Sequence, residues 1–254
     1  MLLIIVGILT LVIVPKNDRA PGTSKPISEM LQPLRHIRVW RFSLYYVTVF
    51  GAYVALSAWL PKYYVDNFDV SLTTAGLLTA TYIFPASLLR PLGGWMSDRW
   101  GARRVMYATF GIMMISSGIL TMPDGHITIY HPDGSESDLM FYEISLPFFV
   151  LLVFILGCAM GFGKAAVYKH IPDYFPDNVG SVGGLVGMLG GLGGFILPPL
   201  FAYTKTWSGF PSSTFFCIFV LVAISFAWMH LTVYRLMHKA TPKLAREIEE
   251  PVNA

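Results

Sequence analysis

The sequence predicts an all-α membrane protein, built as a six-transmembrane-helix half-bundle that follows the end of one preceding helix. Hydrophobic residues make up 54% of the 254 residues, and charged residues make up only 13%. A soluble domain carries roughly 25% charged residues, so this composition favours a chain embedded in a lipid bilayer. Long uncharged intervals separate the charged residues, and a helix needs about 20 such residues to cross a membrane. The net charge of only +3 gives no reason to expect nucleic acid as a partner.

Taken in order, the chain begins with an apolar run at 1–14 that we interpret as the end of a truncated transmembrane helix. Residues 15–38 are rich in proline and basic residues and are expected to form a cytoplasmic linker. The helical bundle is predicted at 39–237, and a cytoplasmic tail at 238–254. The uncharged intervals of the bundle lie between Arg41 and Lys62, Asp69 and Arg90, Arg104 and Asp124, Glu143 and Lys164, Asp177 and Lys205, and Lys205 and Arg235, the last interrupted by a turn at 208–213.

Basic residues are distributed unevenly between the loops, which predicts the orientation in the membrane. The segment 16–41 holds six Lys or Arg, the turn at 99–104 holds three, and the residues from Arg235 onward hold four. The loop at 121–145 has none and carries five acidic residues. Because cytoplasmic loops carry the excess of Lys and Arg, we expect the basic loops and the C-terminus to lie in the cytoplasm.

The acidic loop at 121–145 contains the sequence His-Pro-Asp-Gly at 131–134, which predicts a turn and a short hairpin. His126 and His131 lie in the same loop, but no third ligand is spaced to complete a metal site. We therefore expect neither a metal nor a cofactor.

Arg90 interrupts an apolar segment and is the main candidate for substrate binding. An arginine at membrane depth costs between about 3 and more than 10 kcal/mol, so a chain that keeps one usually uses its charge. The guanidinium suits a planar oxyanion because it donates two parallel hydrogen bonds. Pro85 and Pro91 flank the residue and predict a loosened helix. The alternative is an Arg90 side chain that extends to the inner membrane surface.

Tyr46 lies in the preceding apolar segment and is a candidate for the same site. Its ring would form a wall beside a flat anion, and its hydroxyl group would donate a hydrogen bond. Ordinary packing inside the bundle is an equally good explanation of a tyrosine at this position.

A charged turn follows Arg90 and has the pattern G-x-x-x-D-R-x-G-x-R-R. Glycine permits a tight turn, the aspartate can pair with an arginine or cap a helix, and the arginines hold the turn at an anionic membrane surface. We interpret it as a conformational latch, and the alternative is an ordinary basic loop. The spacing resembles the signature loop of the major facilitator superfamily. The residues concerned are Gly94, Asp98, Arg99, Gly101, Arg103 and Arg104.

Glycines recur through the sequence GSVGGLVGMLGGLGGF at 180–195 and predict a close contact between helices. Several pairs are spaced by four residues, which places a glycine stripe on one helix face. Glycine weakens a helix, so close packing or hinge motion must offset this cost. Gly187 and Gly191 are the candidates for contact with substrate, and the alternative is a plain packing seam.

Lys164 falls inside an apolar segment, and His170 follows near the predicted inner end of the same helix. A lysine at this depth would compensate charge or carry a proton, so both residues are candidates for proton coupling. The alternatives are a lysine that extends to the membrane surface and a histidine at the interface. Pro172 and Pro176 are expected to end this helix.

Together these motifs resemble the C-terminal half of NarK-type nitrate/nitrite porters of the major facilitator superfamily. The most specific parts are GGWMSDRWGARR, which follows Arg90, and the glycine run, which is similar to the nitrate signature of that family. The resemblance implies alternating access, in which two halves move around a site near the middle of the membrane. It also implies that Arg90 and Tyr46 contact nitrate or nitrite, that protons are a candidate coupling ion, and that an N-terminal half is missing from this sequence.

We therefore expect an integral protein of the bacterial inner membrane that transports nitrate or nitrite and is not an enzyme. No paired intramembrane carboxylates, metal-spaced His and Cys residues or nucleophile elbow occur in the sequence to indicate catalysis. Two alternatives stay open: a non-transporting membrane sensor or assembly protein with the same fold, and a carrier for another small anion. Proton symport and nitrate/nitrite exchange are both compatible with these motifs.

Overall fold

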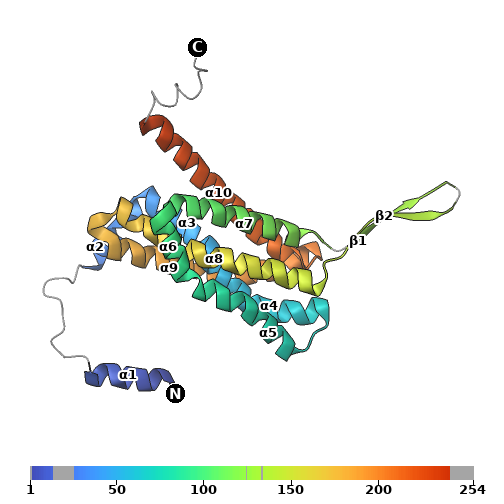
Figure 1. The fold of residues 1–254 in the computed structure, drawn as a ribbon, viewed down its shortest axis with the longest axis horizontal. Helices are drawn as coiled ribbons and strands as arrows, with labels where there is room; N and C mark the ends of the chain where they lie inside the picture. Colours follow the sequence, from blue (N-terminus) through green and yellow to red (C-terminus); the bar gives the residue numbers. More distant parts are fainter. Residues whose placement is uncertain (1, 14–25, 124, 133, 241–254) are drawn as a thin grey trace, which may run out of the picture. The chain divides into compact units, whose positions relative to one another are not determined.

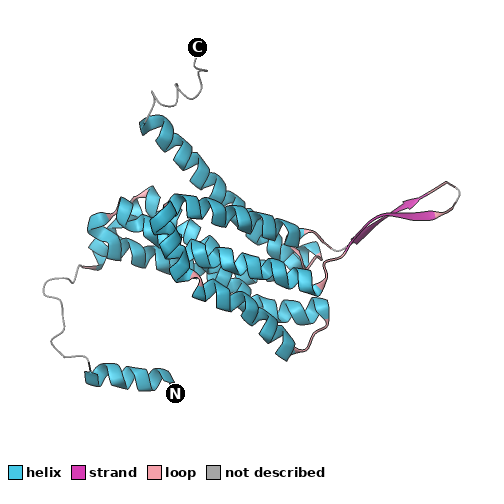
Figure 2. Cartoon of the chain, in the orientation of Figure 1, coloured by secondary structure: helices cyan, strands magenta, loops and turns pink. Residues whose placement is uncertain are grey.

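Helices dominate the computed structural model of the chain, which describes residues 2–13, 26–123, 125–132 and 134–240 (Figures 1 and 2). Part of the predicted linker at 15–38 and most of the predicted tail at 238–254 lie outside these described residues.

Two compact units divide the chain, Met1–Gln32 and Pro33–Ala254. The first unit contains helix α1 (Leu2–Ile13), which forms in the apolar run predicted as the end of a helix, and the short helix α2 (Ile27–Leu31). The second unit contains the bundle and all of the candidate site residues.

The apolar segments of the second unit form the predicted spanning helices. Among the described residues, five helical segments are long and apolar enough to cross a membrane, and α5 with α6 makes a sixth span that bends by 41°. Counting the bent α5–α6 pair as one span gives six spans, which is the number predicted. The elements are η1 (Gln32–Arg35), α3 (Ile37–Tyr46), the π-helical turn η2 (Val47–Gly51), α4 (Ala52–Phe68), α5 (Leu72–Leu88), α6 (Arg90–Trp100), α7 (Ala102–Thr121), β1 (Gly125–Tyr130), β2 (Glu136–Tyr142), α8 (Leu146–Tyr174), η3 (Pro176–Asn178), α9 (Val179–Ser208) and α10 (Ser213–Ala240).

A β-hairpin connects α7 to α8, as the turn sequence at 131–134 predicts. Strand β1 pairs antiparallel with β2, so that Gly125 lies opposite Tyr142 and Tyr130 lies opposite Glu136. Figure 1 shows the hairpin projecting from the end of the second unit opposite the α6–α7 turn, and Figure 2 draws it in magenta. Successive connections therefore alternate between the two ends, as helices that cross a membrane one after another require.

Helix α8 packs against α5, α6 and α7, whereas α9 packs against α3, η2 and α4. Buried aromatic rings fill the end of the unit that carries the hairpin. The ring of Tyr63 lies parallel to that of Phe149 at 5.2 Å between centroids, and Phe215 meets both rings edge-on. Offset-stacked and edge-to-face contacts of this kind add to the burial of apolar area, so this cluster fixes one end of the bundle.

Large apolar side chains cover the outside of the second unit. Phe84, Phe195 and Trp207 have 64%, 80% and 82% of their surface exposed. Soluble monomers rarely expose large apolar patches, so these side chains face lipid or another protein surface. Together with the spanning helices, they indicate an integral membrane protein.

Helix α8 is longer than the sequence predicts at its C-terminal end. The expectation that Pro172 helps to end it is wrong, because the helix continues through Pro172 to Tyr174 and only Pro176 lies beyond it. Proline removes one backbone hydrogen bond from a helix. Ile171 is only 1% exposed, however, and its burial holds the last turn against the core.

The glycine run in α9 forms a close contact with η2. A Cβ atom added to Gly51 would lie 2.7 Å from the Gly190 carbonyl oxygen and 2.9 Å from the Gly193 Cα atom. Both neighbours are backbone atoms, so no side chain can move away to make room. Gly184, by contrast, borders open space. The glycines of α9 therefore divide into a packed face and an open face.

Gly51→Ala is expected to lower the free energy of unfolding of the complete membrane protein by about 1–3 kcal/mol, because overpacking forces the two backbones apart. Gly184→Ala is the matched control, and it should leave stability unchanged or slightly increased, since alanine is the better helix former. Thermal unfolding of both variants in detergent measures the difference. Equal unfolding midpoints for the two variants would show that the Gly51–Gly193 contact is not tight.

Candidate functional site

The candidate site is built around the bend between α5 and α6. Helix α5 ends at Leu88, Leu89 adopts φ −80° and ψ −2°, and α6 begins at Arg90. Pro91 has no N–H to donate and its ring crowds the preceding turn, so the helix axis changes direction here. Gly93 fixes the new direction, because a Cβ atom on it would lie 2.6 Å from the Cα atom of Phe162 in α8.

Arg90 lies at this bend beside the rings of two tyrosines. Its Nη2 atom donates a long hydrogen bond of 3.4 Å to the Tyr46 hydroxyl oxygen. Its Cζ atom lies 5.8 Å from the centroid of the Tyr168 ring. No carboxylate of the described residues forms an ion pair with this guanidinium. The structure therefore brings Arg90 and Tyr46 together, as predicted, and leaves the positive charge without a counter-charge.

An aromatic wall surrounds the Tyr46 ring, which is only 3% exposed. Phe50 stacks on it at 4.9 Å between ring centroids, and Tyr168 meets it edge-on at 5.0 Å. The π-helical turn η2 begins directly after Tyr46, and such turns frequently mark functional sites. Sequence reasoning missed Phe50 and Tyr168. Their spacing of four from Tyr46 and Lys164 would have placed them on the same helix faces as these two candidates.

Lys164 is buried against the same group of elements and does not extend to the membrane surface. Only 2% of the residue is exposed. Its Nζ atom donates a 3.0 Å hydrogen bond to the Ala86 carbonyl oxygen of α5 and lies 3.2 Å from the centroid of the Tyr53 ring. No described carboxylate pairs with it. Because Tyr168 follows Lys164 by about one turn of α8, the two basic groups, Lys164 and Arg90, lie on one side of the bundle.

Gly187 and Gly191, the two glycines predicted to contact substrate, have different surroundings. A Cβ atom on Gly187 would lie 2.7 Å from the Tyr168 hydroxyl oxygen, and that hydroxyl donates a 3.1 Å hydrogen bond to the Gly183 carbonyl oxygen. Because Gly187 has no side chain, the Tyr168 side chain packs directly against α9. Gly191 borders open space, as does Gly94 in α6.

The charged turn between α6 and α7 forms around Gly101, whose φ of +88° is one that L side chains rarely adopt. Asp98 pairs with Lys169 of α8 rather than with an arginine. Arg99 lies over the ring of Trp95, with 5.5 Å between its Cζ atom and the ring centroid. An exposed ion pair of this kind adds little stability, which suits a contact that breaks and re-forms.

Arg103, Arg104 and His170 lie away from the bend, around two adjoining cavities next to this turn. The His170 ring stacks on Phe42 of α3 at 5.9 Å, with 8° between the ring planes. The two candidates for proton coupling, Lys164 and His170, therefore have different neighbours and do not form a single site.

This arrangement can bind a small anion reversibly. Arg90 offers a fork of N–H donors, and the Tyr46 hydroxyl group accepts a hydrogen bond from it. The rings of Phe50 and Tyr168 provide flat apolar surfaces beside these donors. Within the described part of the chain, no group of three or more His, Cys, Asp or Glu side chains is placed to hold a metal ion.

The chain is similar to a known protein family and to named transport proteins. The family model described as Major Facilitator Superfamily matches residues 50–253. Over 248 residues, the chain is 59% identical to a Thermus thermophilus protein named "Probable nitrate/nitrite antiporter NarK1", covering 98% of this chain and 56% of that protein. It is 27% identical over 195 residues to the "Nitrite extrusion protein" of Bacillus subtilis, covering 76% of this chain and 44% of that protein. The chain thus spans about half the length of these relatives.

Solved structures of transporters share the arrangement of helices. The outward conformation of FucP superposes with a TM-score of 0.61 at 16% identity, covering 90% of this chain and 51% of FucP. The inward-open xylose transporter XylE of E. coli gives a TM-score of 0.58 at 14% identity, covering 86% of this chain and 57% of XylE. At this level of identity the likeness shows the fold alone.

Lys164→Met is expected to leave the thermal unfolding midpoint of the complete protein unchanged or raised. Methionine has nearly the same length and flexibility, and a buried ammonium group without a carboxylate is costly to keep. Lys164→Ala is the comparison, and it should lower the midpoint because it leaves a cavity. A large loss of stability in Lys164→Met would show instead that the contacts of the ammonium group with Ala86 and Tyr53 hold the bundle together.

Proposed function

Because the chain belongs to the Major Facilitator Superfamily, we propose that it forms the C-terminal half of a carrier that moves nitrate or nitrite across a membrane. The observation that carries this proposal is the Arg90 guanidinium, which lies beside aromatic rings without a described carboxylate partner. Relatives whose names refer to nitrate or nitrite transport support the choice of anion.

Arg90 selects for a small oxyanion in this proposal. A guanidinium donates two parallel hydrogen bonds to a planar pair of oxygens, which nitrate and nitrite both present. Tyr46 adds a hydroxyl donor, and the Phe50 and Tyr168 rings exclude water and favour a flat ligand. Arg90 itself is exposed on the surface of the unit, so the other half of the carrier would cover the bound anion.

Two features of the bundle are proposed to serve the movement between access states: the glycine face of α9, and the ion pair between Asp98 and Lys169. The glycine face of α9 lets helices slide at close range. Gly187 meets Tyr168 of the site, and Gly191, which borders open space, follows it by about one turn of α9. The pair formed by Asp98 and Lys169 ties α6 to α8 in one access state. Gly101 supplies the turn that places this latch at the end of the bundle.

In this proposal, the positive charge of the site makes the change of access state depend on anion binding. Lys164 and Arg90 together place two cationic groups near one anion, and an unloaded site would leave both without a counter-charge. Exchange of nitrate for nitrite keeps an anion in the site during every crossing and needs no proton. Symport requires a group that takes up a proton, and Lys164 and His170 are the proposed candidates.

The proposed orientation follows from the arginines of the α6–α7 turn. The α6–α7 turn, whose sequence carries Arg99, Arg103 and Arg104, lies at one end of the bundle, and the hairpin of the acidic loop lies at the other. The basic end is proposed to face the cytoplasm of a bacterial cell, with the C-terminus on the same side of the inner membrane.

Arg90→Lys is expected to lower nitrate uptake by the complete carrier by roughly 100-fold, because lysine keeps the charge but loses the paired N–H donors. Uptake into proteoliposomes that contain equal amounts of inserted protein measures this effect. Arg35→Lys, an exposed arginine outside the site, is the matched control and should transport like the parent.

Normal uptake by Arg90→Lys would overturn the assignment of Arg90. Nitrate binding without any uptake by the parent protein would instead favour a sensor with the same fold. Uptake of another small anion in preference to nitrate and nitrite would keep the site but change its substrate.

A further inference from the structure

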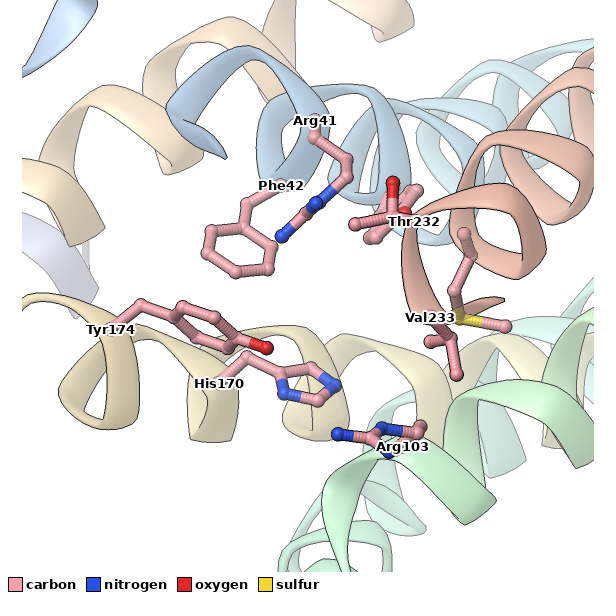
Figure 3. A pocket seen from close by; sticks show the side chains of 9 residues that line it. Arg41, Phe42, Arg103, His170, Tyr174, Thr232 and Val233 are labelled. Carbon is pink, nitrogen blue, oxygen red and sulfur yellow. The ribbon is translucent and has the colours of Figure 1, made fainter. Parts of the chain in front are cut away.

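A second group of basic side chains meets at the α6–α7 end of the bundle, apart from Arg90. Figure 3 shows Arg41 of α3, Arg103 of α7, and His170 and Tyr174 of α8 directed toward one space. This space is a cavity of about 30 Å³ between α3, α7, α8 and α10. Its lining is completed by Phe42, Tyr45, Met229, Thr232 and Val233.

Arg41 is the residue in this cavity that most needs an explanation. It is only 8% exposed, and none of the described carboxylates forms an ion pair with it. Its Cζ atom lies 5.2 Å from the centroid of the Phe42 ring and 6.0 Å from that of Tyr174. These contacts offset part of the cost of burial, but they provide no hydrogen-bond acceptor for the guanidinium.

Tyr45 provides an independent observation at the same cavity. The residue is 3% exposed, and its hydroxyl group is buried without a hydrogen-bond partner among the described residues. A buried hydroxyl group without a partner costs roughly 1–3 kcal/mol, so native structures usually supply one. Tyr45 and Arg41 thus line one cavity, and neither side chain has a hydrogen-bond acceptor among the described residues.

We propose that this cavity binds a small oxyanion group, either a free inorganic anion or the phosphate of a phospholipid headgroup. Arg41 and Arg103 carry like charges that repel one another, and an anion between them converts that repulsion into attraction. Guanidinium groups are well suited to phosphate and similar oxyanions. A volume of about 30 Å³ holds roughly two water molecules, which matches one oxyanion group rather than a whole organic molecule.

The surroundings of the cavity allow either source of the oxyanion. A wider groove of about 540 Å³ adjoins it and shares Arg103, His170 and Tyr174 as lining residues. Arg104 and Asp173 also line this groove. The groove has room for the rest of a headgroup, and its one described carboxylate, Asp173, lies outside the lining of the inner cavity. The site is separate from the proposed substrate-binding residues, since Arg90 and Tyr46 line neither space, although it shares Arg103 with the latch and His170 with the coupling candidates.

Thermal unfolding of the complete protein in detergent tests the proposal. Inorganic phosphate, titrated at constant ionic strength, and dioctanoyl phosphatidylglycerol are the two probes, and dioctanoylglycerol is the lipid control without a phosphate. At least one probe should raise the unfolding midpoint, and Arg41→Gln should require at least about tenfold more of it. Arg35→Gln, which removes an exposed arginine that lines neither space, should respond like the parent.

The outcomes separate the two sources. Stabilisation by inorganic phosphate indicates a free anion, whereas stabilisation by phosphatidylglycerol alone indicates a headgroup. Arg103→Gln removes an exposed lining residue and replaces Arg41→Gln in the test if the latter fails to fold. Absence of any response in the parent, or responses of the Arg41 and Arg103 variants equal to that of the parent, would overturn the proposal. A response to dioctanoylglycerol equal to that to phosphatidylglycerol would also overturn it for the lipid source.

Discussion

The positive charge of Arg90, held at the bend between α5 and α6, is the constraint on which the rest of the candidate site depends. The described residues offer it the Tyr46 hydroxyl group and the Tyr168 ring, but no carboxylate. A charge at membrane depth needs a counter-charge or water. In the proposed carrier the transported anion supplies that counter-charge, so binding and movement of the two halves become linked.

Much of the fold could be predicted from the sequence because a bilayer imposes length and composition on each segment. The uncharged intervals located the five long apolar helices and the bent α5–α6 pair, and the turn sequence at 131–134 located the hairpin. Gly101 was predicted to form a tight turn, and its φ of +88° confirms this. The end of α8 was predicted too early in the chain, because Pro172 removes only one hydrogen bond while buried Ile171 holds the final turn in place.

The candidate site could be predicted only in part, because it depends on contacts between distant segments. Arg90 was recognisable as a charge in an apolar run. Phe50 and Tyr168 were not, since an aromatic residue in such a run is ordinary until packing places it against Tyr46, which contacts Arg90. Arg41 was counted only as a charge at the end of a span. Its burial in a basic cavity follows from the packing of α3, α7, α8 and α10, which no local pattern shows.

An experimental structure of the complete protein with nitrate bound tests the central claim most directly. The account predicts nitrate oxygens at hydrogen-bond distance, about 3 Å, from the Arg90 guanidinium and beside the Tyr46 ring. Nitrate bound elsewhere, with Arg90 directed toward lipid headgroups or paired with a carboxylate of the other half, would contradict it.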